Sequence, residues 1–152
     1  VFPNLYELID CFDKNDDFEF IVDEKKILSG KKYIKLLSIK SDSLSKLNLR
    51  ILFEFQEAGN NYLIGGYTYL NSKEKEKFNK EYILLKNNFN LQFNNYNVKS
   101  SPGWPAFFTY DHFMNWSKNH NDLSNIIFDD FKEDLKQKIE TMLEIVNKIN
   151  LQ

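Results

Sequence analysis

The sequence predicts an α+β fold, in which an antiparallel sheet of about four or five strands carries helices on one face and a long C-terminal helix. Two patterns support this prediction. Apolar and polar residues alternate from Asn48 to Gln56, which is typical of a strand with one buried face. Towards the end of the chain, apolar residues recur at helical spacing, as in a helix packed on a core. The length of 152 residues fits one domain, and an opening Val1 is consistent with a fragment of a larger protein.

The first part of the chain holds short predicted elements. A proline in the first turn and apolar residues at helical spacing predict a helix over Phe2–Phe12. A polar segment then precedes a strand over Phe18–Val22, and residues 23–28 fit a strand or a helix equally well. Ser29–Lys32 is a predicted turn that leads into Tyr33–Lys40.

The central part of the chain predicts a β-hairpin. The strand at Asn48–Gln56 is followed by a Gly-Asn turn at Ala58–Asn61 and by a second strand at Tyr62–Leu70. Gly65 and Gly66 lie inside that second strand, which indicates a bulge or the close approach of another backbone. The residues expected to be buried together on the first strand are Leu49, Ile51, Phe53 and Phe55.

Two helices are predicted in the second half of the chain. Ser72 is expected to cap a helix that ends near Asn88, and residues 89–100 fit an edge strand or an ordered loop. The second helix runs from about Ser124 to the end and would be roughly 40 Å long. This length exceeds what a small core needs, so its last turns are expected to meet another protein chain, either in a homodimer or on a larger partner. The residues concerned are Met142, Val146 and Ile149. The alternative is that the sheet is long enough to cover the whole apolar stripe.

The segment from Ser101 to Trp116, SPGWPAFFTYDHFMNW, contains both tryptophans of the chain and several other aromatic residues. Such a segment buries a large apolar area. It can do so as a plug at one end of the sheet, beneath the C-terminal helix, or as an exposed surface that anchors a partner. The candidate partner-binding residues in this segment are Trp104, Phe107, Tyr110 and Trp116.

Composition limits the classes of partner. Twenty basic residues against 22 acidic ones give a net charge of −2, and Arg50 is the single arginine, which argues against nucleic acid as the partner of this chain alone. No apolar run is long enough to span a membrane. The single cysteine, Cys11, excludes an intrachain disulfide and a thiolate metal cage, and we therefore expect a cytoplasmic protein.

We assign no catalytic residue, and we expect no metal or cofactor. Glu24 and Lys26 form the Glu-x-Lys pattern of metal-dependent nucleases, but in a chain this rich in charge a solvated segment is the simpler interpretation. His112 and His120 lack the i, i+4 spacing of a helical metal pair. The acidic run at 129–134 fits a solvated helix face that complements the helix dipole.

Four stretches in this order carry a resemblance to a known group of proteins: ILFEF, NNYLIGGYTY, PGWPAFFTYDHFMNW and DLSNIIFDDFKEDLKQKIE. Their order resembles the region that follows the nuclease core in bacterial proteins of the PD-(D/E)XK nuclease superfamily. The resemblance covers about Asn48 to Lys148. The nuclease core itself is not matched, so no catalytic residue is carried over. The resemblance implies an accessory domain in bacterial or phage biology, with a role in defence.

The sequence therefore favours a non-catalytic protein-interaction or accessory module. The alternative is a metal-dependent PD-(D/E)XK-like nuclease, or the remnant of one, that acts on DNA. The first hypothesis predicts a stable complex with a protein partner. The second predicts DNA cleavage that depends on a divalent metal, and we expect none from this chain alone because no second acidic ligand is placed beside Glu24 and Lys26.

Overall fold

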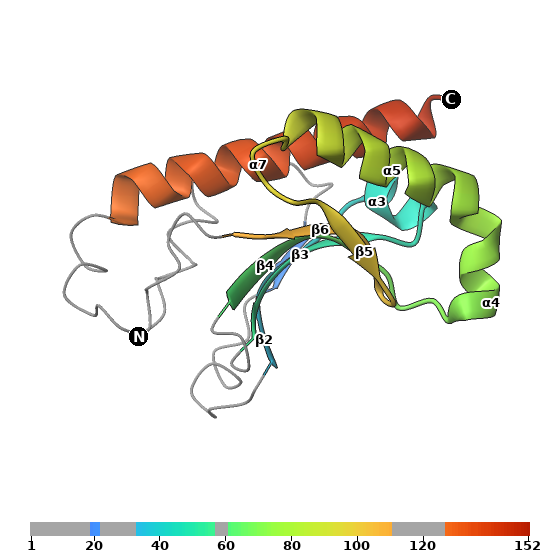
Figure 1. The fold of residues 1–152 in the computed structure, drawn as a ribbon, viewed down its shortest axis with the longest axis horizontal. Helices are drawn as coiled ribbons and strands as arrows, with labels where there is room; N and C mark the ends of the chain where they lie inside the picture. Colours follow the sequence, from blue (N-terminus) through green and yellow to red (C-terminus); the bar gives the residue numbers. More distant parts are fainter. Residues whose placement is uncertain (1–18, 22–32, 57–60, 111–126) are drawn as a thin grey trace.

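The computed structural model describes residues 19–21, 33–56, 61–110 and 127–152 (Figure 1). They form an α+β fold with an antiparallel sheet, helices and a long C-terminal helix, as predicted. The sheet has six strands in the order β1-β2-β3-β4-β6-β5, and each neighbouring pair is antiparallel. Two three-residue strands at its edges raise the number above the four or five expected.

The strands are β1 (Glu19–Ile21), β2 (Tyr33–Lys40), β3 (Arg50–Gln56), β4 (Asn61–Tyr67), β5 (Lys99–Ser101) and β6 (Trp104–Thr109). The helices are α3 (Asp42–Lys46), α4 (Ser72–Lys75), α5 (Asn79–Gln92) and α7 (Ile127–Asn150), with a 3-10 turn, η2 (Glu76–Phe78), between α4 and α5. The predicted helix at 2–12, the predicted turns at 29–32 and 58–61, and the segment at 23–28 lie wholly or mainly outside the described residues.

The predicted hairpin is confirmed. Strands β3 and β4 pair antiparallel without interruption, with Phe53 opposite Ile64. Leu49, Ile51 and Phe53 are buried, as the alternation predicted. The side chain of Phe55 lies outside the described residues.

Gly65 allows β6 to pack closely against β4. A Cβ atom at this position would lie 2.2 Å from the carbonyl oxygen of Ala106 and 2.5 Å from the Cα of Phe107. The close backbone approach predicted from the Gly-Gly pair is therefore present, and the β3–β4 register shows no bulge there.

Residues 104–109 form strand β6, which the sequence did not predict as a strand. The stretch WPAFFT lacks regular alternation and contains a proline, so its pattern resembles a loop or a plug. It pairs with β4 on one side and β5 on the other, and tertiary pairing has overridden the local pattern. The turn between β5 and β6 is Pro102-Gly103, with Gly103 at φ 86°, which matches a type II turn.

The helical segment after β4 begins one residue earlier than predicted. Asn71, and not Ser72, is the N-cap, and it forms a capping box with Glu74. The Asn71 side chain accepts from the Glu74 backbone N–H at 2.9 Å, and Glu74 Oε1 accepts from the Asn71 backbone N–H at 3.2 Å. The segment also extends to Gln92, so the first part of the predicted strand or loop at 89–100 is helical.

The main core lies between one face of the sheet and the helices α3, α5 and α7, which Figure 1 shows on the same side of the sheet. Strands contribute alternate side chains such as Ile51, Phe53 and Ile64. The described part of the predicted α7 stripe faces this core; its buried members are Leu135, Ile139, Met142, Val146 and Ile149.

A second, smaller cluster lies on the opposite face of the sheet. It consists of Leu52, Leu63 and Trp104, with the half-buried Tyr67 and Phe107 packed against them. Leu52 and Leu63 alternate along their strands with core residues, so their side chains point away from the helices.

Candidate functional site

The candidate site is a groove between α5 and the edge strand β5, with a volume of about 340 Å³. One wall comes from the α4–α5 segment and the other from β5 and the start of β6. The residues that line it are Ser72, Lys75, Glu76, Asn79, Tyr82, Ile83, Lys86, Ser100, Ser101 and Pro105.

Strand β5 forms the last position in the sheet, and all three of its residues are exposed. An edge strand pairs on one side only, so part of its backbone N–H and C=O groups point outward. Its pairing with β6 shifts register between Lys99 and Ser101, and the Pro102-Gly103 turn fixes where the strand ends. The outer rim of the groove is therefore a short backbone edge to which an extended peptide could bind.

The wall formed by α5 contains one exposed apolar residue, Ile83, which follows the buried and hydrogen-bonded Tyr82. Tyr82 is buried, and its hydroxyl donates to the backbone oxygen of Leu47 at 2.8 Å and is 3.3 Å from Thr68 Oγ1. Burial raises the pKa of Tyr82, so this hydroxyl stays protonated and serves as a structural donor. One position further along, the Ile83 side chain is 59% exposed and lines the groove.

The groove carries a local excess of positive charge. Lys75 and Lys86 line it and are half-buried, and Glu76 is the one carboxylate among its described lining residues. Neither lysine forms an ion pair with another described residue. Serine hydroxyls and the Asn79 amide supply neutral donors and acceptors. This arrangement is suited to binding an extended segment with carboxylates.

The aromatic candidates Trp104 and Phe107 belong to the smaller cluster. Trp104 is buried and packs edge-on against Tyr67, with ring centroids 5.1 Å apart. Its ring centroid is 5.4 Å from that of Phe107, which is half-buried. Both residues serve as packing within this chain, and Trp116 lies outside the described residues.

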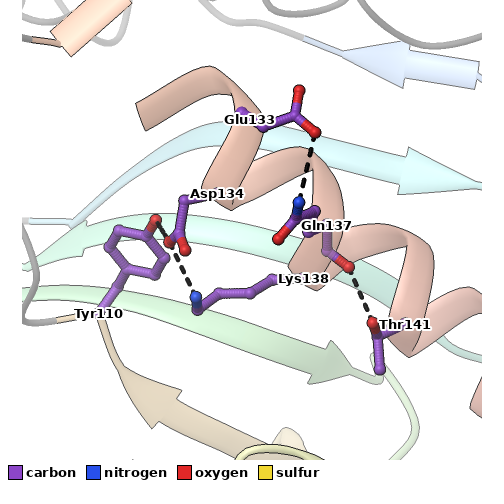
Figure 2. Close-up of polar contacts among 6 residues, drawn as sticks. All are labelled: Tyr110, Glu133, Asp134, Gln137, Lys138 and Thr141. Carbon is purple, nitrogen blue, oxygen red and sulfur yellow. Dashed lines mark hydrogen bonds and ion pairs between the residues drawn. The ribbon is translucent and has the colours of Figure 1, made fainter. Parts of the chain in front are cut away.

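Tyr110 is a core residue, so the expectation of an exposed aromatic anchor does not hold at this position. Figure 2 shows its hydroxyl directed at Asp134 on α7, to which it donates a hydrogen bond. Lys138 Nζ is 2.8 Å from the same Asp134 oxygen and lies 5.3 Å from the centroid of the Tyr110 ring. Burial, with the hydrogen bond to the Asp134 carboxylate, raises the pKa of Tyr110. The trio fastens α7 to the end of β6.

The last turns of α7 are covered by this chain. Met142, Val146 and Ile149 are buried in the main core, beside α3 and α5. Figure 1 shows α5 running alongside the C-terminal half of α7. The expectation that these residues extend beyond the core of this chain is wrong, because α3 and α5 pack beside them; the sequence predicted a helix at α5 but none at α3.

The other candidate chemistry falls largely outside the described residues. Glu24, Lys26, His112 and His120 are not described, and neither are the side chains at 129–132. Of the remaining acidic run, Glu133 is exposed and lies 3.4 Å from the Gln137 amide. In the described part of the chain, no group of three or more His, Cys, Asp and Glu residues could hold a metal ion.

Sequence reasoning did not identify the groove, because its walls come from residues 72–86 and 100–105, which the fold alone brings together. Two local signals were present: the Pro-Gly turn that creates an edge strand, and an isoleucine on the polar side of a helix. Comparison with protein-family models, with curated proteins and with solved structures finds no match. None of the described helices is long and apolar enough to cross a membrane.

Proposed function

We propose that this chain is a protein-interaction module that binds an extended segment of a partner protein as an added strand on β5. The observation that carries this proposal is the exposed edge strand beside a groove whose other wall is α5. Strand addition at such a position takes affinity from main-chain hydrogen bonds and specificity from side-chain contacts.

The side chains of the groove favour a particular kind of segment. Ile83 offers contact to one apolar side chain, and Lys75 and Lys86 favour carboxylates on either side of it. Lys99 is exposed on β5, and its charge disfavours pairing of this edge strand with strands that carry no complementary charge. The same charge favours an acidic strand. The proposed ligand is therefore an extended acidic segment with one apolar residue directed at α5.

The resemblance to regions that follow a nuclease core supports an accessory role in a bacterial or phage protein. In this proposal the chain contributes binding and not catalysis. The single cysteine supports a cytoplasmic setting, in which a free thiol stays reduced.

Selection from a display library of random peptides on the purified chain tests the proposal. We expect enriched peptides to be acidic and to share one apolar position. Hydrogen exchange then distinguishes strand addition from other binding modes, because an added strand protects backbone amides of residues 99–101. Enriched peptides that leave these amides unprotected would contradict strand addition.

Three variants locate the binding site. Ile83→Glu and Lys86→Glu should each weaken binding of the selected peptide by about tenfold, since each removes a favourable contact and adds a like charge. Leu91→Glu is the matched control, because Leu91 is also an exposed apolar residue of α5, at 73%, but does not line the groove. Equal affinities for all three variants, or no enrichment at all, would remove the proposal.

A further inference from the structure

The single arginine of the chain lies in a second pocket, separate from the peptide groove. Arg50 opens strand β3, and the pocket beside it has a volume of about 260 Å³. Its walls come from the end of β2, the end of α3, and the segment that follows β4. The lining residues that bear on its chemistry are Lys40, Ser45, Asn48, Arg50 and Tyr69.

The Arg50 side chain is held in place by a tyrosine, and no carboxylate of the described residues pairs with it. Its guanidinium carbon lies 4.7 Å from the centroid of the Tyr69 ring, and one terminal nitrogen is 3.5 Å from the Tyr69 hydroxyl. The Tyr69 ring packs edge-on against Tyr67, with centroids 4.9 Å apart. Arg50 forms no ion pair within the described part of the chain, so most of its N–H donors are available to a ligand.

The rest of the lining combines polar residues with two leucines, Leu49 and Leu70. None of the described residues that line this pocket is acidic. Asn48 adopts a left-handed conformation, φ 52°, at the end of α3, and Asn48 and Ser45 both line the same pocket. This lining contrasts with the net charge of −2 of the whole chain.

We propose that this pocket binds a phosphoryl oxyanion, either free phosphate or the phosphate of a monoester. A guanidinium with unused donors binds such a group through two parallel hydrogen bonds. The hydroxyl and amide of Ser45 and Asn48 can supply further hydrogen bonds. The volume accommodates a phosphoryl group with a short substituent.

The single arginine makes the test unambiguous, because the chain gives one arginine Nε–H signal in a ¹⁵N-correlated NMR spectrum. We expect inorganic phosphate to shift this signal saturably, and sodium chloride at the same ionic strength to leave it in place. A parallel titration with N-acetyl-phosphoserine amide identifies the source. Tighter binding of this compound indicates a phosphate borne by a larger molecule, and equal or weaker binding indicates the free anion.

Variants separate a specific site from general attraction to positive charge. Arg50→Lys keeps the charge but loses the paired donors, so phosphate affinity, followed by backbone amide shifts, should fall by about tenfold. Lys73→Gln, on the exposed surface of α4, is the control and should bind as the wild type does. Tyr69→Phe keeps the aromatic ring beneath Arg50 and removes only the hydroxyl. It is a second variant of this pocket in which loss of folding is not expected to explain a change in binding. Unchanged affinity in Arg50→Lys, or no saturable shift with either phosphate compound, would overturn the proposal.

Discussion

On the helix-covered face of the sheet, side chains from β2, β3, β4 and β6 meet three helices in one continuous core, whereas the described residues of the opposite face form a smaller cluster around Leu52, Leu63 and Trp104. The same strands supply both faces, since alternate residues point in opposite directions. The difference teaches that most of the stabilising apolar burial depends on the helices. It also predicts that equivalent changes on the two faces have unequal costs.

The largest effect is expected in the main core. Phe53→Ala removes a fully buried ring that stacks on Tyr62 and meets Tyr110 edge-on, with centroids 5.7 and 6.1 Å away. The free energy of unfolding should fall by about 3–5 kcal/mol. Urea denaturation followed by circular dichroism measures it. A loss below about 1 kcal/mol would show that this face does not dominate stability.

The next test concerns the contact between β4 and β6. In Gly65→Ala the new methyl group would collide with the Ala106 and Phe107 backbone, which cannot move aside without breaking the strand pair. We expect a loss of about 2–3 kcal/mol. Gly66→Ala is the matched control, because the nearest atom to its methyl group is the end of the Leu85 side chain, at 3.0 Å, and the next atoms, of Leu49 and Ala106, lie at ordinary contact distances of 3.8 and 3.9 Å. If the two variants unfold at the same urea concentration, the close approach at Gly65 is not needed for stability.

The smaller cluster is tested by Trp104→Ala. Tryptophan is larger than phenylalanine, yet we expect a cost of about 2–3 kcal/mol, below that of Phe53→Ala. The reason is that Tyr67 and Phe107 are half-buried and can relax into the space. The comparison uses the same denaturation experiment. A cost above that of Phe53→Ala would reverse the ranking of the two faces.

The smallest effect concerns the link between β6 and α7. Tyr110→Phe removes the hydrogen bond to Asp134 and should cost about 1 kcal/mol at neutral pH, since Asp134 keeps Lys138. The pKa of Tyr110 is raised in the folded state, so its contribution is fully present below pH 10, the ordinary tyrosine value, and is lost above it. Wild-type stability should therefore fall more steeply above pH 10 than that of the variant. Parallel slopes from pH 10 to 11 would contradict this.

The sequence predicted the helices and strands whose apolar residues repeat regularly within a single segment. The alternation from Asn48 to Gln56 predicted β3 and the apolar stripe predicted α7, because each pattern marks the face that packs in the main core. On β3 the other face is buried as well, at Leu52 and Glu54. Strand β6 was missed, since its residues pack on both faces of the sheet and show no simple period. The sequence pattern predicts Ser72 as the helix cap, whereas in the structure Asn71 is the cap and forms the reciprocal bonds with Glu74.

The candidate sites were less predictable than the fold. The aromatic segment at 101–116 led to a prediction of partner binding because protein cores and protein interfaces are both rich in aromatic residues. Sequence alone does not distinguish the two. Neither Arg50 nor Ile83 carries a recognisable motif. Each becomes part of a candidate site only through a residue that is distant in the sequence. Arg50 stacks on Tyr69, and Ile83 lines the same groove as Ser100.

Helix α7 follows every described strand in the chain, and this order has a consequence for how the protein is made. Its last turn is fastened to α3 by a hydrogen bond from Asn150 Nδ2 to the Ser43 backbone oxygen, 2.8 Å long and 107 residues apart in sequence. The strands leave the ribosome before α7 does, so part of their apolar face waits uncovered while synthesis continues. We expect the nascent chain to be most prone to aggregation, and most dependent on chaperones, in that interval.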